Sequence, residues 1–226
     1  MVVEIVFFIV FMILYFYVYV ELKVNKHNQI YYFDKEITRE HIYKESLIKL
    51  PFFFNGKHIN EDYGKSSMTQ INKTKQYKMY EKSYDEISLL EPYTKFKAEQ
   101  YIYTIKKNGY LPLLSLESSL NYLIVKKGKV KISFVHPKFK ENVKNRDKLK
   151  DNQHMIDYIK EHNNIHTLEC FENTVIYVPN HWILFIENIH DHASTLEIIY
   201  YKTITNQTLR FMKKQYNKMI NIRDNV

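Results

Sequence analysis

The sequence predicts a mainly β domain with flanking helices, preceded by one N-terminal transmembrane helix. Residues 2–22 are apolar or aromatic apart from two glutamates, and about 20 helical residues suffice to cross a bilayer. Residues 172–188 hold two apolar, β-rich runs on either side of Pro179, together with the only tryptophan, Trp182. Because β-branched and aromatic residues favour a pleated surface and Pro cannot donate to a ladder, this stretch predicts a strand, a sharp corner and a second strand.

The apolar run is predicted to be an uncleaved anchor over residues 1–25. A signal peptide has a basic start and small residues at its cleavage site. Residues 1–25 contain no Lys or Arg before Lys23, and no Ala, Gly or Ser. Tyr15, Tyr17 and Tyr19 gather near one end of the run, as in an interfacial aromatic belt. A buried core helix is the alternative, but such a helix usually shows a polar stripe.

The distribution of charge predicts the orientation of the anchor. Lys23, Lys26 and Lys35 follow the apolar run closely, whereas only the terminal amine precedes it. The positive-inside rule therefore places the C-terminal domain on the cytoplasmic side. The Asn-x-Thr tripeptides at Asn72 and Asn206 would indicate the opposite side if they were glycosylated, but such tripeptides arise by chance in an Asn-rich chain.

Composition argues against several classes of function. The single cysteine, Cys170, excludes an internal disulfide framework and a multi-cysteine metal site. It lies in an apolar strand pattern, which predicts a buried structural thiol. The formal charge of +8 would suit phosphate groups, but basic and acidic residues alternate, as at Lys144, Arg146 and Asp147. Nucleic-acid binding is therefore not expected, and attraction to an anionic membrane surface is favoured.

Local patterns predict the remaining elements in order. Residues 37–43 predict a short amphipathic helix, and residues 50–56 a Pro-led strand closed by an Asn-Gly turn. Residues 57–90 are polar and predict no specific element. The charged segment 138–164 is expected to be an insertion with one short helix near residues 155–159. Further strands are predicted at residues 101–105, 166–171 and 195–203.

Residues 204–226 are predicted to form a C-terminal helix. Its apolar side chains recur near helical spacing, at Leu209, Phe211, Met212, Tyr216, Met219 and Ile220. A stripe of Met and aromatic residues more often packs on a core or forms a dimer surface than binds a ligand. The helix is therefore expected to pack, with homo-oligomerisation through it as a further expectation, and any other protein partner is unknown.

Two segments resemble the paired signatures of cupin-like and JmjC-like domains. In residues 172–188, a strand ends in Tyr177-Val178-Pro179, and the chain then turns at a segment that contains an aromatic residue. In residues 111–137, four anchors match the family pattern without a gap: Asn121, Tyr122, Gly128 and Pro137. The resemblance implies a double-stranded β-helix, or jelly roll, over residues 36–226, with Tyr177 and Trp182 buried beside the barrel mouth. Together with the apolar helix and the residue bias, it resembles proteins of large DNA viruses, which implies a host or virion membrane.

The resemblance also implies a degenerate metal site. Enzymes of this family hold iron(II) with two His and one carboxylate and leave positions open for oxygen and 2-oxoglutarate. Residue by residue, these ligand positions fall on Ser115, Glu117 and Leu184, which are expected to converge in space. The family Lys that pairs with 2-oxoglutarate falls on Val130. No catalytic, cofactor-binding or metal-binding residue is therefore expected, and no cofactor.

Two alternatives to that interpretation stay open. If the match to the family pattern were shifted by one or two residues, His181 or His136 would fall on a ligand position. The protein would then be an iron(II)- and 2-oxoglutarate-dependent dioxygenase. A one-residue slip, however, turns every side chain of a strand to its other face. The cluster His190-Asp191-His192 could bind zinc or iron through two imidazoles, but a polar turn between strands favours a solvated loop. The sequence thus favours a membrane-anchored domain with a binding or structural role.

Overall fold

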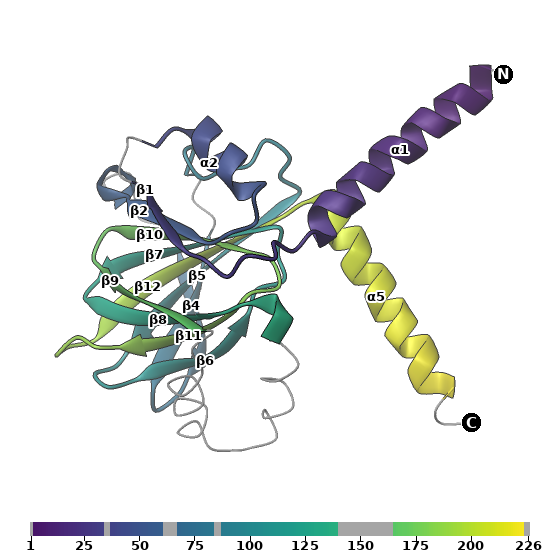
Figure 1. The fold of residues 1–226 in the computed structure, drawn as a ribbon. Coiled ribbons are helices and arrows are strands. Elements are labelled where there is room, and N and C mark those ends of the chain that lie inside the picture. Colours follow the sequence, from purple (N-terminus) through teal and green to yellow (C-terminus); the bar gives the residue numbers. More distant parts are fainter. Residues whose placement is uncertain (1, 34–36, 61–66, 84–86, 140–164, 224–226) are drawn as a thin grey trace.

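Two facing β-sheets form the body of the molecule, and two long helices project from one corner of it (Figure 1). This computed structural model describes residues 2–33, 37–60, 67–83, 87–139 and 165–223. Residues 140–164, which make up most of the predicted charged insertion and its short helix, lie outside the described residues.

The large sheet has eight strands and the small sheet has four. In order, the large sheet contains β1 (Tyr31–Phe33), β2 (Phe52–Asn55), β10 (Thr174–Pro179), β7 (Leu120–Lys127), β12 (Ser194–Lys202), β5 (Lys97–Ile105), β4 (Tyr77–Lys82) and β3 (Met68–Lys73). The small sheet contains β6 (Tyr110–Ser115), β11 (Ile183–Asn188), β8 (Lys129–Val135) and β9 (Ile165–Phe171). Only the β1–β2 pair is parallel among these described strands.

The strands from β5 to β12 have jelly-roll topology. They form two antiparallel groups, β5-β12-β7-β10 and β6-β11-β8-β9, and the chain changes sheet at each step except from β8 to β9. This wrapping of paired strands defines a double-stranded β-helix. The predicted mainly β, cupin-like fold class is therefore confirmed.

The predicted corner at Pro179 joins the two sheets. Strand β10 lies in the large sheet and β11 in the small one, so the two runs do not form a hairpin. His181, between them, has a φ of 71°, the left-handed region that allows a tight change of direction. The His181 N–H donates to the Leu116 carbonyl at 2.6 Å, and the Leu116 N–H donates to the Trp182 carbonyl at 3.1 Å. The segment after β6 thus holds the corner in place.

Apolar side chains cover both faces of the large sheet along its central strands. The barrel interior between the sheets includes Trp182, which is 1% exposed. Tyr177 is also fully buried, but it packs in a second cluster on the opposite face, beneath helix α2 (Arg39–Ser46), where its hydroxyl donates to the Ser46 carbonyl at 3.1 Å. The predicted burial of both aromatic residues is confirmed, although they lie in different layers.

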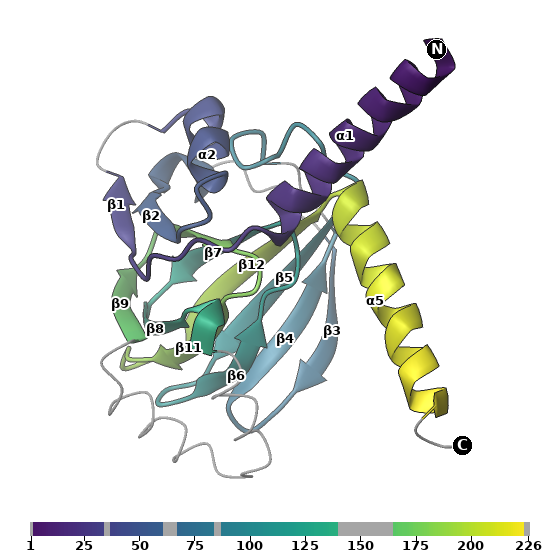
Figure 2. The same cartoon turned by 45° about the vertical axis from the view of Figure 1, so that its right-hand side comes forward.

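The two terminal helices leave the domain from the same corner and diverge (Figures 1 and 2). Helix α1 (Val2–Leu22) is exposed along most of its length, and α5 (Ile204–Arg223) begins beside its C-terminal end. In α5, Phe211 and Met212 are 62% and 60% exposed. These two side chains do not pack on the domain, because α5 projects away from both sheets, and the dimer surface stays a prediction.

Three strands and two short 3₁₀ turns lie outside the predicted elements. Strand β1 precedes residue 36, so the sheet begins before the predicted domain boundary. Strands β3 and β4 form a hairpin at the edge of the large sheet, within the segment where no specific element was expected. The 3₁₀ turns span Lys57–Asn60 and Pro137–Phe139.

We expect Gly128→Ala to lower the free energy of unfolding by about 1 to 3 kcal/mol, the usual cost of a strained backbone position. Gly128, between β7 and β8, has a φ of 88°, and an added Cβ would lie 2.3 Å from the Ser194 hydroxyl oxygen. Ser194 cannot easily move, because it is buried and donates to Asn188 Oδ1 at 2.7 Å. Denaturant melts measure the loss. The exposed neighbouring change Lys127→Ala should cost under about 0.5 kcal/mol, and an equal cost would contradict the explanation.

Candidate functional site at the base of helix α1

Ser115 lies opposite Ile183, the residue beside Leu184 on the paired strand β11, but the predicted metal positions differ in burial. Leu184 is fully buried in the barrel interior, whereas Ser115 and Glu117 are exposed. Leu116, between them, points into the interior instead. Glu117 lies near Arg210 of helix α5, with 3.4 Å between carboxylate and guanidinium. The side chains of Ser115 and Glu117 therefore do not enter the interior that Leu184 fills, because the chain after β6 presents Leu116 to the core.

The predicted co-substrate position lies inside the barrel. Val130 is fully buried on β8, and its neighbours Lys129 and Lys131 lie on the opposite face, as expected for a regular strand. Lys129 pairs with Glu169 at 2.6 Å and lies over the Phe171 ring. No lysine of β8 therefore faces the interior.

The same interior contains the only cysteine. Cys170 is completely buried beside Val130 on the paired strand β9. Burial raises the pKa of its thiol to about 12, since the thiolate is poorly solvated there. The predicted burial of this thiol is confirmed.

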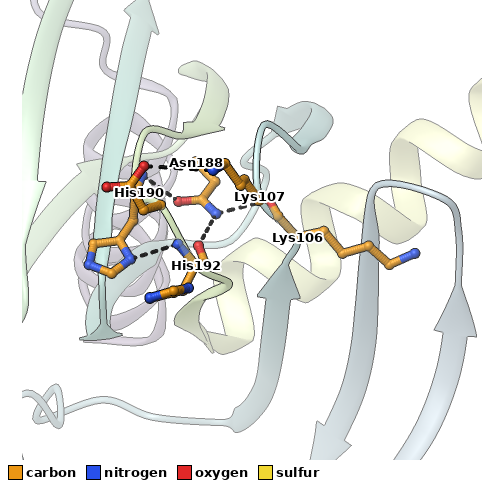
Figure 3. Close-up of polar contacts among 6 residues, drawn as sticks. Lys106, Lys107, Asn188, His190 and His192 are labelled. Carbon is orange, nitrogen blue, oxygen red and sulfur yellow. Dashed lines mark hydrogen bonds and ion pairs between the residues drawn. The ribbon is translucent and has the colours of Figure 1, made fainter.

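The His190-Asp191-His192 cluster forms a tight turn organised by Asn188 (Figure 3). The Asn188 amide nitrogen lies 2.8 Å from the His192 carbonyl and 2.9 Å from the Lys106 carbonyl, and its Oδ1 accepts from the His190 N–H at 2.9 Å. The imidazole Nδ1 of His190 accepts the His192 N–H at 3.1 Å and is therefore already engaged. Asp191 lies 3.8 Å from the Lys107 ammonium. Among the described residues, no group of three or more His, Cys, Asp or Glu side chains has the arrangement of a metal site.

A polar junction joins helix α1 to the jelly roll. Glu21, in the last turn of α1, is buried, and its Oε1 accepts from the Asn206 amide at 2.9 Å. The Asn180 amide, at the corner between the sheets, donates to the Glu21 carbonyl at 2.6 Å. The Asn206 amide also donates to the Glu117 carbonyl at 2.9 Å. The base of α1 is thus bound to the barrel corner and to the start of α5.

Two histidines hold the linker that follows α1. His136 Nε2 lies 2.7 Å from the Asn25 carbonyl, and His166 Nε2 lies 2.5 Å from the Asn28 carbonyl. His136 also packs edge-on against Trp182, with 5.0 Å between ring centroids. The alternative ligand His136 therefore binds backbone of the linker, and sequence analysis gave no signal for this role.

The hydrogen bonds of His136 predict a pH effect on stability. Its Nδ1 accepts the Lys138 N–H at 3.1 Å, so the neutral tautomer with a proton on Nε2 satisfies both nitrogens. Burial lowers the pKa of His136 below its usual value near 6.5. The unfolded state therefore binds the proton more readily, so protonation favours unfolding. The stability that the neutral His136 contributes is present above pH 6.5 and is lost as the pH falls below that value. Melts between pH 5 and 8 should show a shallower pH slope for His136→Gln than for the parent, and equal slopes would contradict the explanation.

A buried ionic cluster lies on the opposite face of the large sheet from the barrel interior. Glu197 of β12 is fully buried and lies 3.0 Å from the Lys126 ammonium and 3.6 Å from that of Lys82. It also accepts a hydrogen bond from the Gln100 amide. Sequence analysis missed this cluster, because its members come from four strands.

No family model and no curated protein matches the chain. Among solved structures, it is similar to an oxalate decarboxylase of Lactobacillus farciminis in a formate complex, with 11% identity, a TM-score of 0.39 and coverage of 61% of this chain and 32% of that one. A mutant oxalate decarboxylase of Bacillus subtilis has 12% identity, a TM-score of 0.39 and coverage of 60% and 28%. The chain thus corresponds to about a third or less of each enzyme's length.

Proposed function

We propose that this protein is a single-pass membrane protein whose jelly-roll domain has a non-catalytic binding or structural role at the membrane surface. The observation that carries this proposal is the exposure of α1. An 18-residue stretch of α1 is strongly apolar and none of it is buried, and the barrel core is complete without it. An exposed apolar surface of this kind requires a partner, and a lipid bilayer is the partner that an apolar helix of 21 residues fits.

The junction at Glu21 supports an anchor that stays attached. Glu21 and the linker up to Asn28 contact Asn180, Asn206 and the two linker-binding histidines. Of these contacts, only those of Glu21 involve α1 itself, and a cleaved signal peptide has no reason to form them with the mature domain. The basic residues Lys23 and Lys26 support a cytoplasmic position for the domain. The resemblance to proteins of large DNA viruses suggests a host or virion membrane.

The composition of the barrel interior supports a non-catalytic role. The rival activity, iron(II)- and 2-oxoglutarate-dependent oxygenation, requires imidazole and carboxylate ligands inside the barrel. The interior instead contains Leu116, Val130 and Leu184 at or beside the positions where the resemblance would place the ligands and the co-substrate. These side chains contribute packing energy and offer no lone pair to a metal.

Alkaline carbonate extraction tests the membrane proposal. We expect the full chain to stay in the membrane pellet, and a matched chain lacking residues 2–18 to appear in the supernatant. This deletion keeps Glu21 and the linker, so the domain retains its junction. Iron content after anaerobic reconstitution provides the second measurement, with a ratio far below one iron per chain expected. Release of the full chain by carbonate, or stoichiometric iron, would contradict the respective half of the proposal.

A further inference from the structure

A cavity of about 460 Å³ lies where α1 meets the domain. Its wall combines the last turns of α1 with the segment after α2, the loop before β5 and the start of α5. If α1 crosses the bilayer, this cavity opens at the level of the lipid head groups, because Tyr17, Val20 and Glu21 of the anchor line it. The inference below therefore rests on the proposed function.

Lys49 supplies a buried cation to this cavity. Its side chain is 5% exposed, and its ammonium forms no hydrogen bond or ion pair with any residue that the structure describes. A buried unpaired charge is costly, and Lys49 also has a φ of 62°, which non-glycine residues rarely adopt. Two unfavourable features at one residue indicate a role other than stability. An anion beside the ammonium would offset the cost of burial.

Glu21 supplies the opposite charge to the same cavity. Its Oε1 accepts from Asn206, and its Oε2 has no partner among the described residues. The amide oxygens of Asn180 and Asn206, whose amide nitrogens bind Glu21, are also buried without a donor in that part of the chain. Glu21 and Lys49 line one cavity but form no ion pair with each other. The site thus offers separate positions for a cation and an anion.

Hydroxyl groups complete the polar wall. Ser119 and Thr203 both line the cavity, and their hydroxyl oxygens lie 3.0 Å apart. Only one of the two can donate in that contact, so the other retains a proton for a ligand. Tyr17 and Val20 add apolar surface on the side of the anchor.

We propose that this cavity binds the head group of an aminophospholipid, with the phosphate beside Lys49 and the primary ammonium beside Glu21. A phosphoethanolamine head group carries both charges and continues into acyl chains that lie beside α1. Phosphatidylglycerol lacks the ammonium. The quaternary ammonium of phosphatidylcholine has no N–H to donate to Glu21.

Native mass spectrometry of the full chain, released from nanodiscs with equal amounts of phosphatidylethanolamine, phosphatidylglycerol and phosphatidylcholine, tests this proposal. We expect one retained phosphatidylethanolamine, favoured at least about tenfold over the other two lipids. Lys49→Met should lose the retained lipid, whereas Glu21→Gln, which can still accept from Asn206, should bind without head-group preference. The control Lys131→Met removes a lysine from the small sheet and should behave as the parent. Equal retention of all three lipids by the parent would overturn the proposal.

A soluble head group separates this inference from the proposed function. We expect glycerophosphoethanolamine to bind the parent chain and not Lys49→Met, and inorganic phosphate alone to bind more weakly. Binding of the soluble compound by a chain that fails to anchor would leave the head-group site standing and refute the membrane role. An anchored chain that binds neither the lipid nor the soluble compound would refute the site and leave the anchor.

Discussion

Trp182→Ala is expected to lower the free energy of unfolding by about 3 to 5 kcal/mol, the usual cost of deleting a large aromatic side chain from a core. The indole is 1% exposed and fills the barrel interior next to the corner between the sheets. It also packs against His136, which binds the linker after α1. The deletion should therefore weaken both the core and the attachment of the linker.

Denaturant unfolding of the full chain in detergent measures this loss. Phe171→Ala provides a matched aromatic control, because that ring lies at the end of β9 and is mostly exposed. It should cost no more than about 1 kcal/mol. A loss below 1 kcal/mol for Trp182→Ala would place the indole outside the core and contradict the packing described for the corner.

Glu197→Gln is expected to destabilise the domain by about 3 to 5 kcal/mol, as breaking a buried ion pair does. The change keeps the shape of the side chain but leaves the ammonium groups of Lys82 and Lys126 without their shared carboxylate. Burial already lowers the pKa of Lys126, since its charged form is poorly solvated there. Removal of the carboxylate would make these two charges more costly still.

Apolar replacement of the whole cluster is the matched test. Lys82→Met and Lys126→Met, combined with Glu197→Leu, should recover most of the stability lost in Glu197→Gln, because no unpaired charge remains. The exposed change Glu169→Gln should have little effect, since that ion pair is accessible to water. Equal stability of Glu197→Gln and the parent would show that the cluster carries no net electrostatic energy.

The sequence predicted the jelly roll where strands are buried. The runs that became β7, β8, β10 and β11 are strongly apolar, and Pro179 marks the corner between the last two. Strand β3 could not be predicted in this way, because all six of its residues are exposed and its position depends on pairing with β4. Strand β1 has only three residues, too few for a period-2 pattern.

The junction at the base of α1 could not be predicted from local patterns. The hydrogen bond between Asn206 and Glu21 joins residues 185 positions apart, and that between Asn180 and Glu21 joins residues 159 positions apart. Glu21 gave the only signal, as a carboxylate at the end of an apolar run. The prediction of which side chains face the interior at the metal positions failed for a related reason. A gapless sequence match does not determine which face of a strand end is buried. Here Leu116 occupies the interior in place of Ser115 and Glu117.

The intact mass of the protein recovered from the membrane pellet tests the central claim most directly. If α1 is an anchor, the contacts of its last turn with Asn180 and Asn206 are expected to keep it part of the mature chain. We therefore expect a mass that includes residues 2–22. A mature chain that begins after residue 22 would show that α1 is a removed signal sequence, and both the anchor and its junction with the jelly roll would then be contradicted.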